Sequence, residues 1–278
     1  MFNYCKKMGL LVLLFCVQST PLISWDCCNP CECNRMYIGG FGGGIYSDST
    51  HASQLGSVFI LESVGGAQAI NANGNLKKTS TGFGGVQIGY EWAEFSGYCD
   101  SDWSLSPGLE LEAFFFNHKR KGTFFNPNVR PFLSETVFYN TFQTKSRVVM
   151  ANAILALNSP CLCGFSPYIG GGIGAARIGI DHAKSFQLAP DEPGINHFNS
   201  RKSDSTWVFA GQFKAGLRYN VCDWLELFGE YRYLYLDSGN YIFGSTDYPN
   251  IHAPSSPWNV KIDNTHYNAF AFGIQFNL

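Results

Sequence analysis

Eight charged residues recur at alternate positions within apolar stretches of this chain. They are Glu91, Glu110, Glu112, Lys214, Arg218, Glu226, Glu230 and Arg232. Two carboxylates as close as Glu110 and Glu112 are able to share acid–base chemistry. In an extended strand, however, residues two apart lie on one face, and all eight fall on the face opposite the aromatic residues. Because charges packed together on one face must pair, we interpret the eight as a structural ion-pair network.

The histidines do not form the arrangement of a known membrane enzyme. Lipases, acyltransferases and proteases of the outer membrane need a histidine held next to a serine or an aspartate. The six histidines fall in polar segments or at strand ends, and none belongs to a motif of those enzymes: His51, His118, His182, His197, His252 and His266. We therefore expect a non-enzymatic protein with no catalytic residues, no cofactor and no metal site.

Eight segments carry the weak alternation, about 9–11 residues long, that is typical of transmembrane β-strands. The clearest, 207–219, alternates large apolar residues with Gln212, Lys214 and Arg218. The glycine-dense segment 167–178 would be unfavourable as a helix but leaves room for bulky neighbours inside a narrow barrel. The pattern predicts an all-β fold. The other segments are 35–46, 82–92, 105–116, 147–157, 224–236 and 266–278.

The segments between the expected strands alternate in length. Outer-membrane barrels have short periplasmic turns and long external loops, so both termini are expected in the periplasm. The stretch 57–64 also has strand character, which leaves a barrel of ten strands open. The long segments are 47–80, 117–145, 180–205 and 237–265, and the short ones are 93–104, 158–165 and 220–223.

The chain ends on a strand with one fully apolar face. An apolar strand end is an aggregation hazard in water but suits the lipid-facing closing strand of a barrel. Gly273, Phe276 and Leu278 have the spacing of the carboxy-terminal signal that outer-membrane barrels present to their assembly machinery, although Ala271 stands where a polar residue is usual. The apolar face consists of Phe270, Phe272, Ile274, Phe276 and Leu278.

With this ending and the strand pattern, nearly the whole chain after the amino-terminal segment resembles the small eight-stranded outer-membrane barrels. That family includes the transmembrane domain of outer membrane protein A and the opacity-type surface proteins. The resemblance implies an eight-stranded, antiparallel, up-and-down transmembrane β-barrel in a bacterial outer membrane. It also implies outer-membrane lipid and the barrel-assembly machinery as partners.

The amino-terminal residues are expected to lie outside the barrel. Residues 9–17 form a short apolar run after two lysines, which is typical of a secretory signal peptide. We assign 1–24 to the signal peptide, 25–34 to a cysteine-rich periplasmic segment and 35–278 to the barrel.

The sequence allows a register for the sixth and seventh strands. If their turn centres on Cys222, Arg218 faces Glu226 and Lys214 faces Glu230. A slip by one residue would turn the charges toward lipid. Because an eight-stranded barrel is wide enough only for side chains to fill it, these pairs predict a plugged lumen. A charge-lined, porin-like channel for small solutes is the alternative.

Ten cysteines are present, and eight of them follow the signal peptide. The periplasm is oxidising, so we expect disulfides within the barrel or to neighbouring envelope proteins. The spacing of Cys28 and Cys31 also fits a redox motif, and the cluster from Cys27 to Cys33 fits a zinc site. On the expected topology all eight lie at the periplasmic rim: Cys27, Cys28, Cys31, Cys33, Cys99, Cys161, Cys163 and Cys222.

Composition and loop content indicate a surface protein. A net charge of −2 gives no basic surface for nucleic acid. We expect a structural or adhesive role in which the external loops contact a host, a phage or a neighbouring cell. Exposed apolar loop residues often mark binding, unless they cover the barrel mouth or extend its strands. The aromatics concerned are Phe124, Phe125, Phe132, Tyr139, Phe186, Phe198, Tyr241, Phe243, Tyr248 and Trp258.

Overall fold

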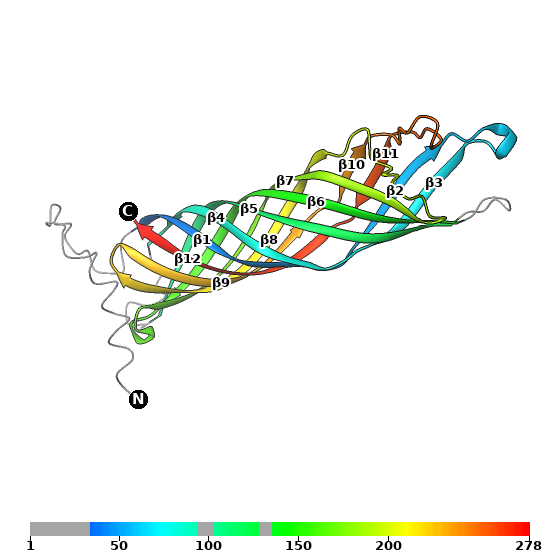
Figure 1. Cartoon of the computed structure of the whole chain (residues 1–278). Coiled ribbons are helices and arrows are strands. Elements are labelled where there is room, and N and C mark those ends of the chain that lie inside the picture. The colour runs from blue at the N-terminus through cyan, green and yellow to red at the C-terminus, as the bar shows by residue number, and fades with distance from the viewer. Residues whose placement is uncertain (1–33, 94–102, 128–134) are drawn as a thin grey trace.

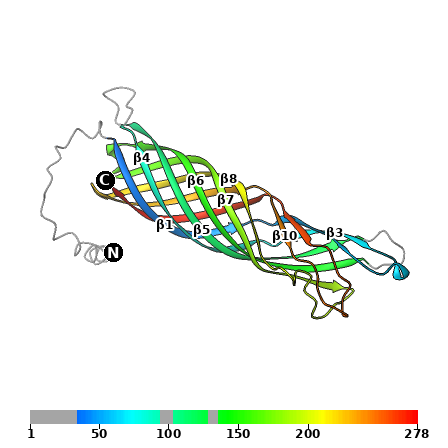
Figure 2. The same ribbon diagram turned by 90° about the horizontal axis from the view of Figure 1, so that it is seen from above.

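Eight strands close into an antiparallel ring (Figure 1, Figure 2). The computed structural model describes residues 34–93, 103–127 and 135–278. The last strand pairs back onto the first, with Tyr37 opposite Asn277, so the ring has no free edge. In ring order the strands are β1 (Arg35–Ser47), β4 (Thr79–Glu91), β5 (Ser104–Asn126), β6 (Thr136–Asn158), β7 (Phe165–Ala189), β8 (Asp204–Cys222), β9 (Leu225–Leu236) and β12 (Thr265–Asn277).

Each of the eight predicted segments coincides with one strand of this ring, so the predicted eight-stranded antiparallel fold is confirmed. The ten-stranded alternative is wrong, because the additional strand near residue 57 joins the sheet outside the ring. Among the described residues, no helix has the length and hydropathy needed to cross a membrane.

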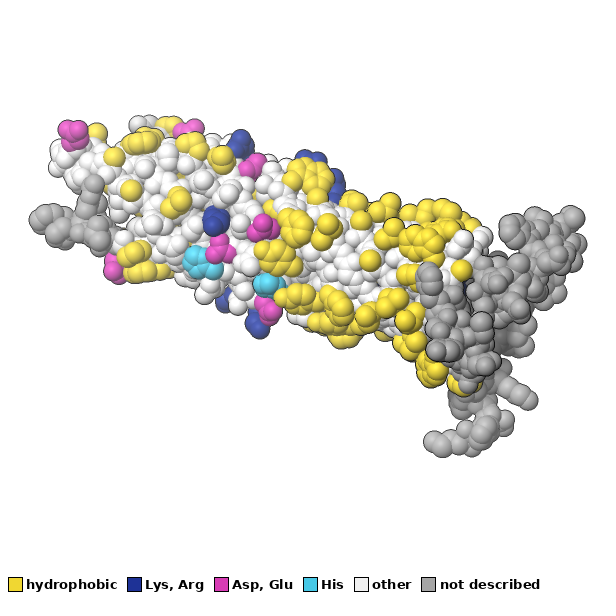
Figure 3. Space-filling model, turned by 180° about the vertical axis from the view of Figure 1, so that it is seen from behind, with side chains coloured by type: hydrophobic (Ala, Val, Ile, Leu, Met, Phe, Trp, Pro, Cys, Tyr) yellow, Lys and Arg dark blue, Asp and Glu magenta, His cyan; other side chains and the backbone are white. Residues whose placement is uncertain are grey.

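The two faces of the ring strands differ in polarity. Val86, Phe115 and Phe272 point outward and are 61%, 62% and 72% exposed, whereas charged residues between such positions are buried. Figure 3 shows a dense belt of hydrophobic side chains over the part of the exterior that carries the C-terminus. Closure satisfies the backbone hydrogen bonds internally, so this belt is suited to contact hydrocarbon.

The ring continues beyond the belt as β-structure. Strands β5, β6 and β7 have 23, 23 and 25 residues, about twice the length that a bilayer requires. Four further strands extend the sheet from β5, in the order β3, β2, β11 and β10. We call these four strands, the ends of β5–β7 and their connections the distal body. The added strands are β2 (Thr50–Val58), β3 (Gln68–Leu76), β10 (Gly239–Phe243) and β11 (Trp258–Ile262).

The distal body has its own hydrophobic core, which corrects the expectation of long external loops rich in exposed aromatics. Phe124, Phe198, Phe243 and Trp258 have no exposed surface. Of the other predicted aromatics, Phe125 is exposed. Tyr241 is buried with the first group, Tyr139, Phe186 and Tyr248 are half-buried, and Phe132 lies outside the described residues. The aromatics therefore extend the strands and hold them together.

Candidate functional site

Five glutamates and four cations are packed inside the ring at the level of the apolar belt. All eight predicted charges belong to this group and are at most 5% exposed. The fourth cation is Arg35, whose side chain is 28% exposed. The glutamates are Glu91, Glu110, Glu112, Glu226 and Glu230, and the cations are Arg35, Lys214, Arg218 and Arg232.

Two arginines hold the carboxylates nearest the end of the ring that carries the C-terminus, which we call the proximal end. Arg35 donates hydrogen bonds to Glu226 at 2.8 Å and to Glu91 at 3.0 Å. Arg218 donates to the other oxygen of Glu91 at 2.7 Å. The guanidinium of Arg218 lies 4.6 Å from the ring centroid of Tyr168, so an aromatic face covers the part of this cation that makes no hydrogen bond.

Lys214 lies at the centre of the lumen among three carboxylates. Its Nζ contacts Glu110 and lies 3.6 Å from Glu112 and 3.8 Å from Glu230. An ammonium group has three donors, so a single lysine is able to serve three glutamates that come from two different strands.

Two tyrosines complete the hydrogen bonds of this cluster. The hydroxyls of Tyr37 and Tyr168 donate to Glu110 and Glu230 at 2.9 and 2.8 Å. Both rings lie in space that glycine leaves free: a Cβ at Gly89 would overlap the ring of Tyr37, and the neighbour of Tyr168 is likewise a glycine, residue 216. The glycines of the strands therefore make room for the side chains that fill the lumen.

A layer of aromatic residues closes the network on its distal side. Arg232 lies 2.9 Å from Glu112, also pairs with Glu230, and stacks with its guanidinium 4.0 Å from the ring centroid of Phe41. The next layer of the lumen is apolar, and the buried rings there are Phe41, Phe83, Phe114 and Phe116.

The predicted register of β8 and β9 is wrong by two residues. Arg218 lies opposite Phe228 rather than Glu226, and Lys214 is not opposite Glu230. The turn lies at Asp223 and Trp224 rather than at Cys222, and this displaced turn, together with an irregular pairing just before it, accounts for the shift. A shift of two residues keeps every side chain on its own face, which explains why the inward placement holds although the partners differ.

The ion pairs therefore connect strands across the lumen. Lys214 still reaches Glu230 at 3.8 Å, but Arg218 pairs with Glu91 of β4, and Glu226 pairs with a residue of β1. That residue is Arg35, which is not among the eight charges predicted from the sequence. It precedes the inward-facing Tyr37 by two positions, so the alternation alone could have placed it in the lumen.

The described cysteines share the proximal rim. Cys161 and Cys163 are exposed in the β6–β7 turn, which contains the short helix η2 (Pro160–Leu162), and Cys222 ends β8; all three are free thiols. Hydrogen bonds join this turn to β8 and the β8–β9 turn to the end of β12. Disulfide formation stays a prediction. The remaining predicted rim cysteines lie outside the described residues: Cys27, Cys28, Cys31, Cys33 and Cys99.

The predicted assembly signal lies at the same end of the ring. Gly273 is opposite Phe41 on β1, Phe276 stacks on Trp224 with ring centroids 6.0 Å apart, and Leu278 is 76% exposed. The two terminal residues of the signal are thus accessible on the lipid face. Its recognition by assembly machinery stays a prediction.

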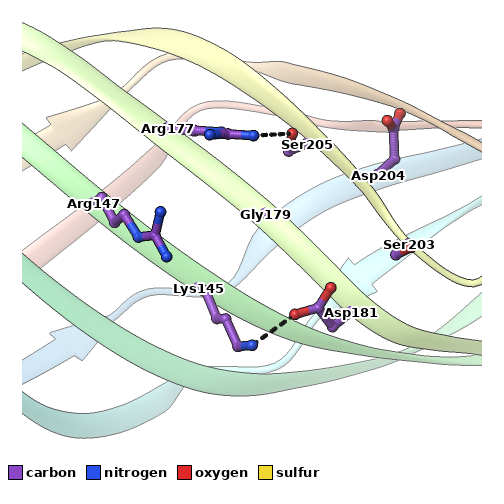
Figure 4. Close-up of a pocket in the computed structure, with 8 residues that line it drawn as sticks. All are labelled: Lys145, Arg147, Arg177, Gly179, Asp181, Ser203, Asp204 and Ser205. Carbon is purple, nitrogen blue, oxygen red and sulfur yellow. Dashed lines mark hydrogen bonds and ion pairs between the residues drawn. The ribbon is translucent and has the colours of Figure 1, made fainter.

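A basic pocket lies on the outer surface where the apolar belt meets the distal body (Figure 4). Arg147 of β6 and Arg177 of β7 are direct register partners and both are exposed. Lys145 pairs with Asp181 at 2.8 Å, but no carboxylate lies between the two arginines in Figure 4. Like charges opposite one another destabilise a sheet, so the two arginines are suited to bind an anion in this cavity of about 350 Å³, which Asp181 and Asp204 also line.

Comparison with known proteins gives one short sequence match. No protein-family model matches the chain. Uncharacterized proteins of Brucella abortus, Brucella suis and Brucella melitensis are 35% identical over 91 residues. The match covers 33% of this chain and 30% of theirs, so the chain spans about a third of the length of these relatives.

Solved structures of small outer-membrane proteins resemble the chain more broadly. OprG from Pseudomonas aeruginosa is 14% identical with a TM-score of 0.43 and covers 89% of this chain and 98% of its own. Neisserial surface protein A is 12% identical with a TM-score of 0.34 and covers 87% and 96%. Ail of Yersinia pestis is 13% identical with a TM-score of 0.27 and covers 86% and 99%. At these identities and scores the likeness does not extend to function.

Replacing Lys214 by methionine is expected to destabilise the barrel by about 3–5 kcal/mol, because three buried glutamates lose their shared cation. Lys261→Met is the matched control: this half-exposed lysine lies 3.5 Å from Asp263, and a surface pair is worth less than about 1 kcal/mol. Urea unfolding in lipid vesicles, followed by tryptophan fluorescence, measures both changes. Equal effects of the two substitutions would contradict a structural role for the lumen network.

Proposed function

We propose that this chain is a non-enzymatic outer-membrane protein with a sealed barrel, which holds the distal body at the cell surface for contact with a host, a phage or a neighbouring cell. In this proposal the proximal rim, with its cysteines and both ends of the barrel domain, faces the periplasm. The rim thiols are then placed to form disulfides with neighbouring envelope proteins.

The observation that carries the proposal is the filled lumen. Lys214, Arg218 and Arg232 each pair with buried carboxylates at the level of the belt. Their charges are therefore already neutralised and do not attract a passing solute. The next layer along the axis is aromatic. Open porins need about 16–18 strands to leave an aqueous channel, and eight strands filled with ion pairs and rings favour a plug.

The refolded barrel is expected to be silent in single-channel recordings across a planar bilayer, because the charged and aromatic layers leave no water-filled path. A conducting porin such as one with 16 strands serves as the positive control for insertion. Reproducible ion-selective steps that change on Lys214→Ala or Glu230→Ala would overturn the sealed barrel and make the protein a small-solute channel.

With the lumen closed, contact with other molecules falls to the surface of the distal body. Its strands are hydrogen-bonded from β10 to β5 and its aromatic side chains form a shared core. Such a body presents a preformed surface, which binds with less loss of conformational entropy than mobile loops do.

Cells that display the whole protein are expected to bind a host cell, a phage or a neighbouring cell, whereas cells that display a ring-only variant are not. In this variant, 50–76 and 239–262 are replaced by short turns, which removes the four added strands. Heat and protease resistance of the ring checks that the variant is inserted and folded. Cell binding that survives this replacement would end the adhesive part of the proposal.

The basic pocket supports the direction of insertion. Arg147 and Arg177 lie immediately distal to the belt, since Val149 on the same strand is an exposed apolar residue. Phosphate groups of outer-leaflet glycolipid would lie at this level and would relieve the repulsion between the two arginines.

The double substitution Arg147→Gln and Arg177→Gln is expected to remove about 1–3 kcal/mol of the stabilisation that lipopolysaccharide gives the barrel, because charged hydrogen bonds to phosphate are lost. Unfolding in mixed micelles with and without lipopolysaccharide measures this difference. Arg201→Gln is the control, because Arg201 is an exposed arginine of the distal body that donates to the backbone of Ile242. An unchanged lipopolysaccharide effect in the double variant would contradict the assignment.

A further inference from the structure

Three potential metal ligands meet in the distal body. Glu192 and His197 come from the β7–β8 connection, and His252 comes from the β10–β11 connection. Oε2 of Glu192 lies 3.4 Å from Nε2 of His197 and 3.3 Å from Nε2 of His252. The three ligand atoms all lie within 4.8 Å of one another.

The hydrogen bonds around His197 determine which of its nitrogens carries the proton. The hydroxyl of Thr246 donates its only hydrogen to the carbonyl oxygen of His197 and accepts from Nε1 of Trp258. Nδ1 of His197 lies 3.3 Å from the same hydroxyl oxygen, so Nδ1 must be the donor. The lone pair of the neutral ring is therefore on Nε2, which points to Glu192.

His252 has the same arrangement. Its Nδ1 lies 2.5 Å from the backbone carbonyl oxygen of Ala253, which only accepts hydrogen bonds. Nδ1 is again the donor, and Nε2 faces Glu192. Metal-binding histidines commonly donate their second N–H to a carbonyl or another acceptor in this way, which fixes the tautomer and the orientation of the ring.

Two atoms of this cluster are buried without a hydrogen bond. Nε2 of His197 and Oε2 of Glu192 have no partner of acceptable geometry in the described part of the chain, and the side chain of His197 is 2% exposed. Proteins rarely leave buried polar atoms in this state, and a bound ion is one of the recognised reasons.

We propose that Glu192, His197 and His252 bind a divalent transition-metal ion of the zinc type. Tetrahedral bonds of about 2.0–2.2 Å place neighbouring ligand atoms about 3.3–3.5 Å apart, which agrees with the two distances from Glu192. Two imidazoles and one carboxylate favour zinc, nickel or copper over calcium and magnesium, which prefer oxygen ligands only.

The fourth coordination position opens into a cavity of about 430 Å³. Polar side chains in its wall include Gln68, Thr136 and Gln187, so water or a small ligand is able to complete the coordination. The ion would join the β7–β8 and β10–β11 connections. It would lie beside the hydrophobic core of the distal body, since His197 packs edge-on against Phe138 and Trp258.

Zinc titration of the refolded, full mature chain tests the site, with the cysteines alkylated so that thiols take up no metal. Calorimetry is expected to show one ion per barrel. His252→Gln and Glu192→Gln should each weaken binding by at least about 100-fold, and Thr246→Val, which removes the acceptor for His197, by about 10–100-fold. Cobalt substitution should give the visible absorption of a four-coordinate ion with nitrogen and oxygen ligands.

The matched control is His51→Gln. His51 also faces a carboxylate, Asp263 at 3.1 Å, but this pair is exposed and has no third ligand within the described part of the chain. His252 is half-buried. Protease resistance of the distal body is the check that the His252→Gln variant is folded. Zinc binding that is unchanged in folded His252→Gln, that is lost in His51→Gln, or that is absent from the wild-type protein below millimolar zinc would overturn the proposal.

Discussion

Closure of the sheet is the constraint on which the rest of this structure depends. Hydrocarbon offers no partner for a backbone N–H or C=O group, so a strand in a bilayer needs a hydrogen-bonded neighbour on each side. Pairing of β12 with β1 meets this requirement with only eight strands. Eight strands make the lumen so narrow that inward side chains touch across it. The buried charges, the tyrosines and the glycines beside them are consequences of that width.

Alternation along the strands made most of the fold predictable. Because successive side chains point to opposite faces, the sequence alone places Glu110 and Lys214 inside and Phe115 and Phe272 outside, as the structure has them. The partners of the charges were less predictable. A shift of two residues between β8 and β9 preserves both faces, so no pattern of polarity reports it. The pair Arg218–Glu91 also joins strands that are not neighbours.

The distal body could not be predicted from the sequence, for a different reason. Its strands lie in segments of polar composition, and its core contains single aromatics such as Phe198 of the β7–β8 connection, Phe243 of β10 and Trp258 of β11. Each aromatic is isolated in the sequence, so a local pattern resembles a loop. Contacts between distant parts of the chain bring them together, such as the stacking of Phe198 on Phe243 and the pairing of β2 with β11, about 200 residues apart. The Glu192–His197–His252 cluster likewise joins two different connections, β7–β8 and β10–β11.

The lumen and the distal body differ in their ability to bind a ligand. In the lumen at the level of the belt, Lys214, Arg218 and Arg232 each lie close to buried carboxylates, and the mutual attraction in a low-dielectric space leaves little affinity for an incoming ligand. In the distal body, buried ligand atoms at His197 and Glu192 remain without a hydrogen bond beside an open cavity. A polar group that is buried and unpaired gains the most free energy from a ligand. The chemistry of this barrel is therefore expected at its distal end.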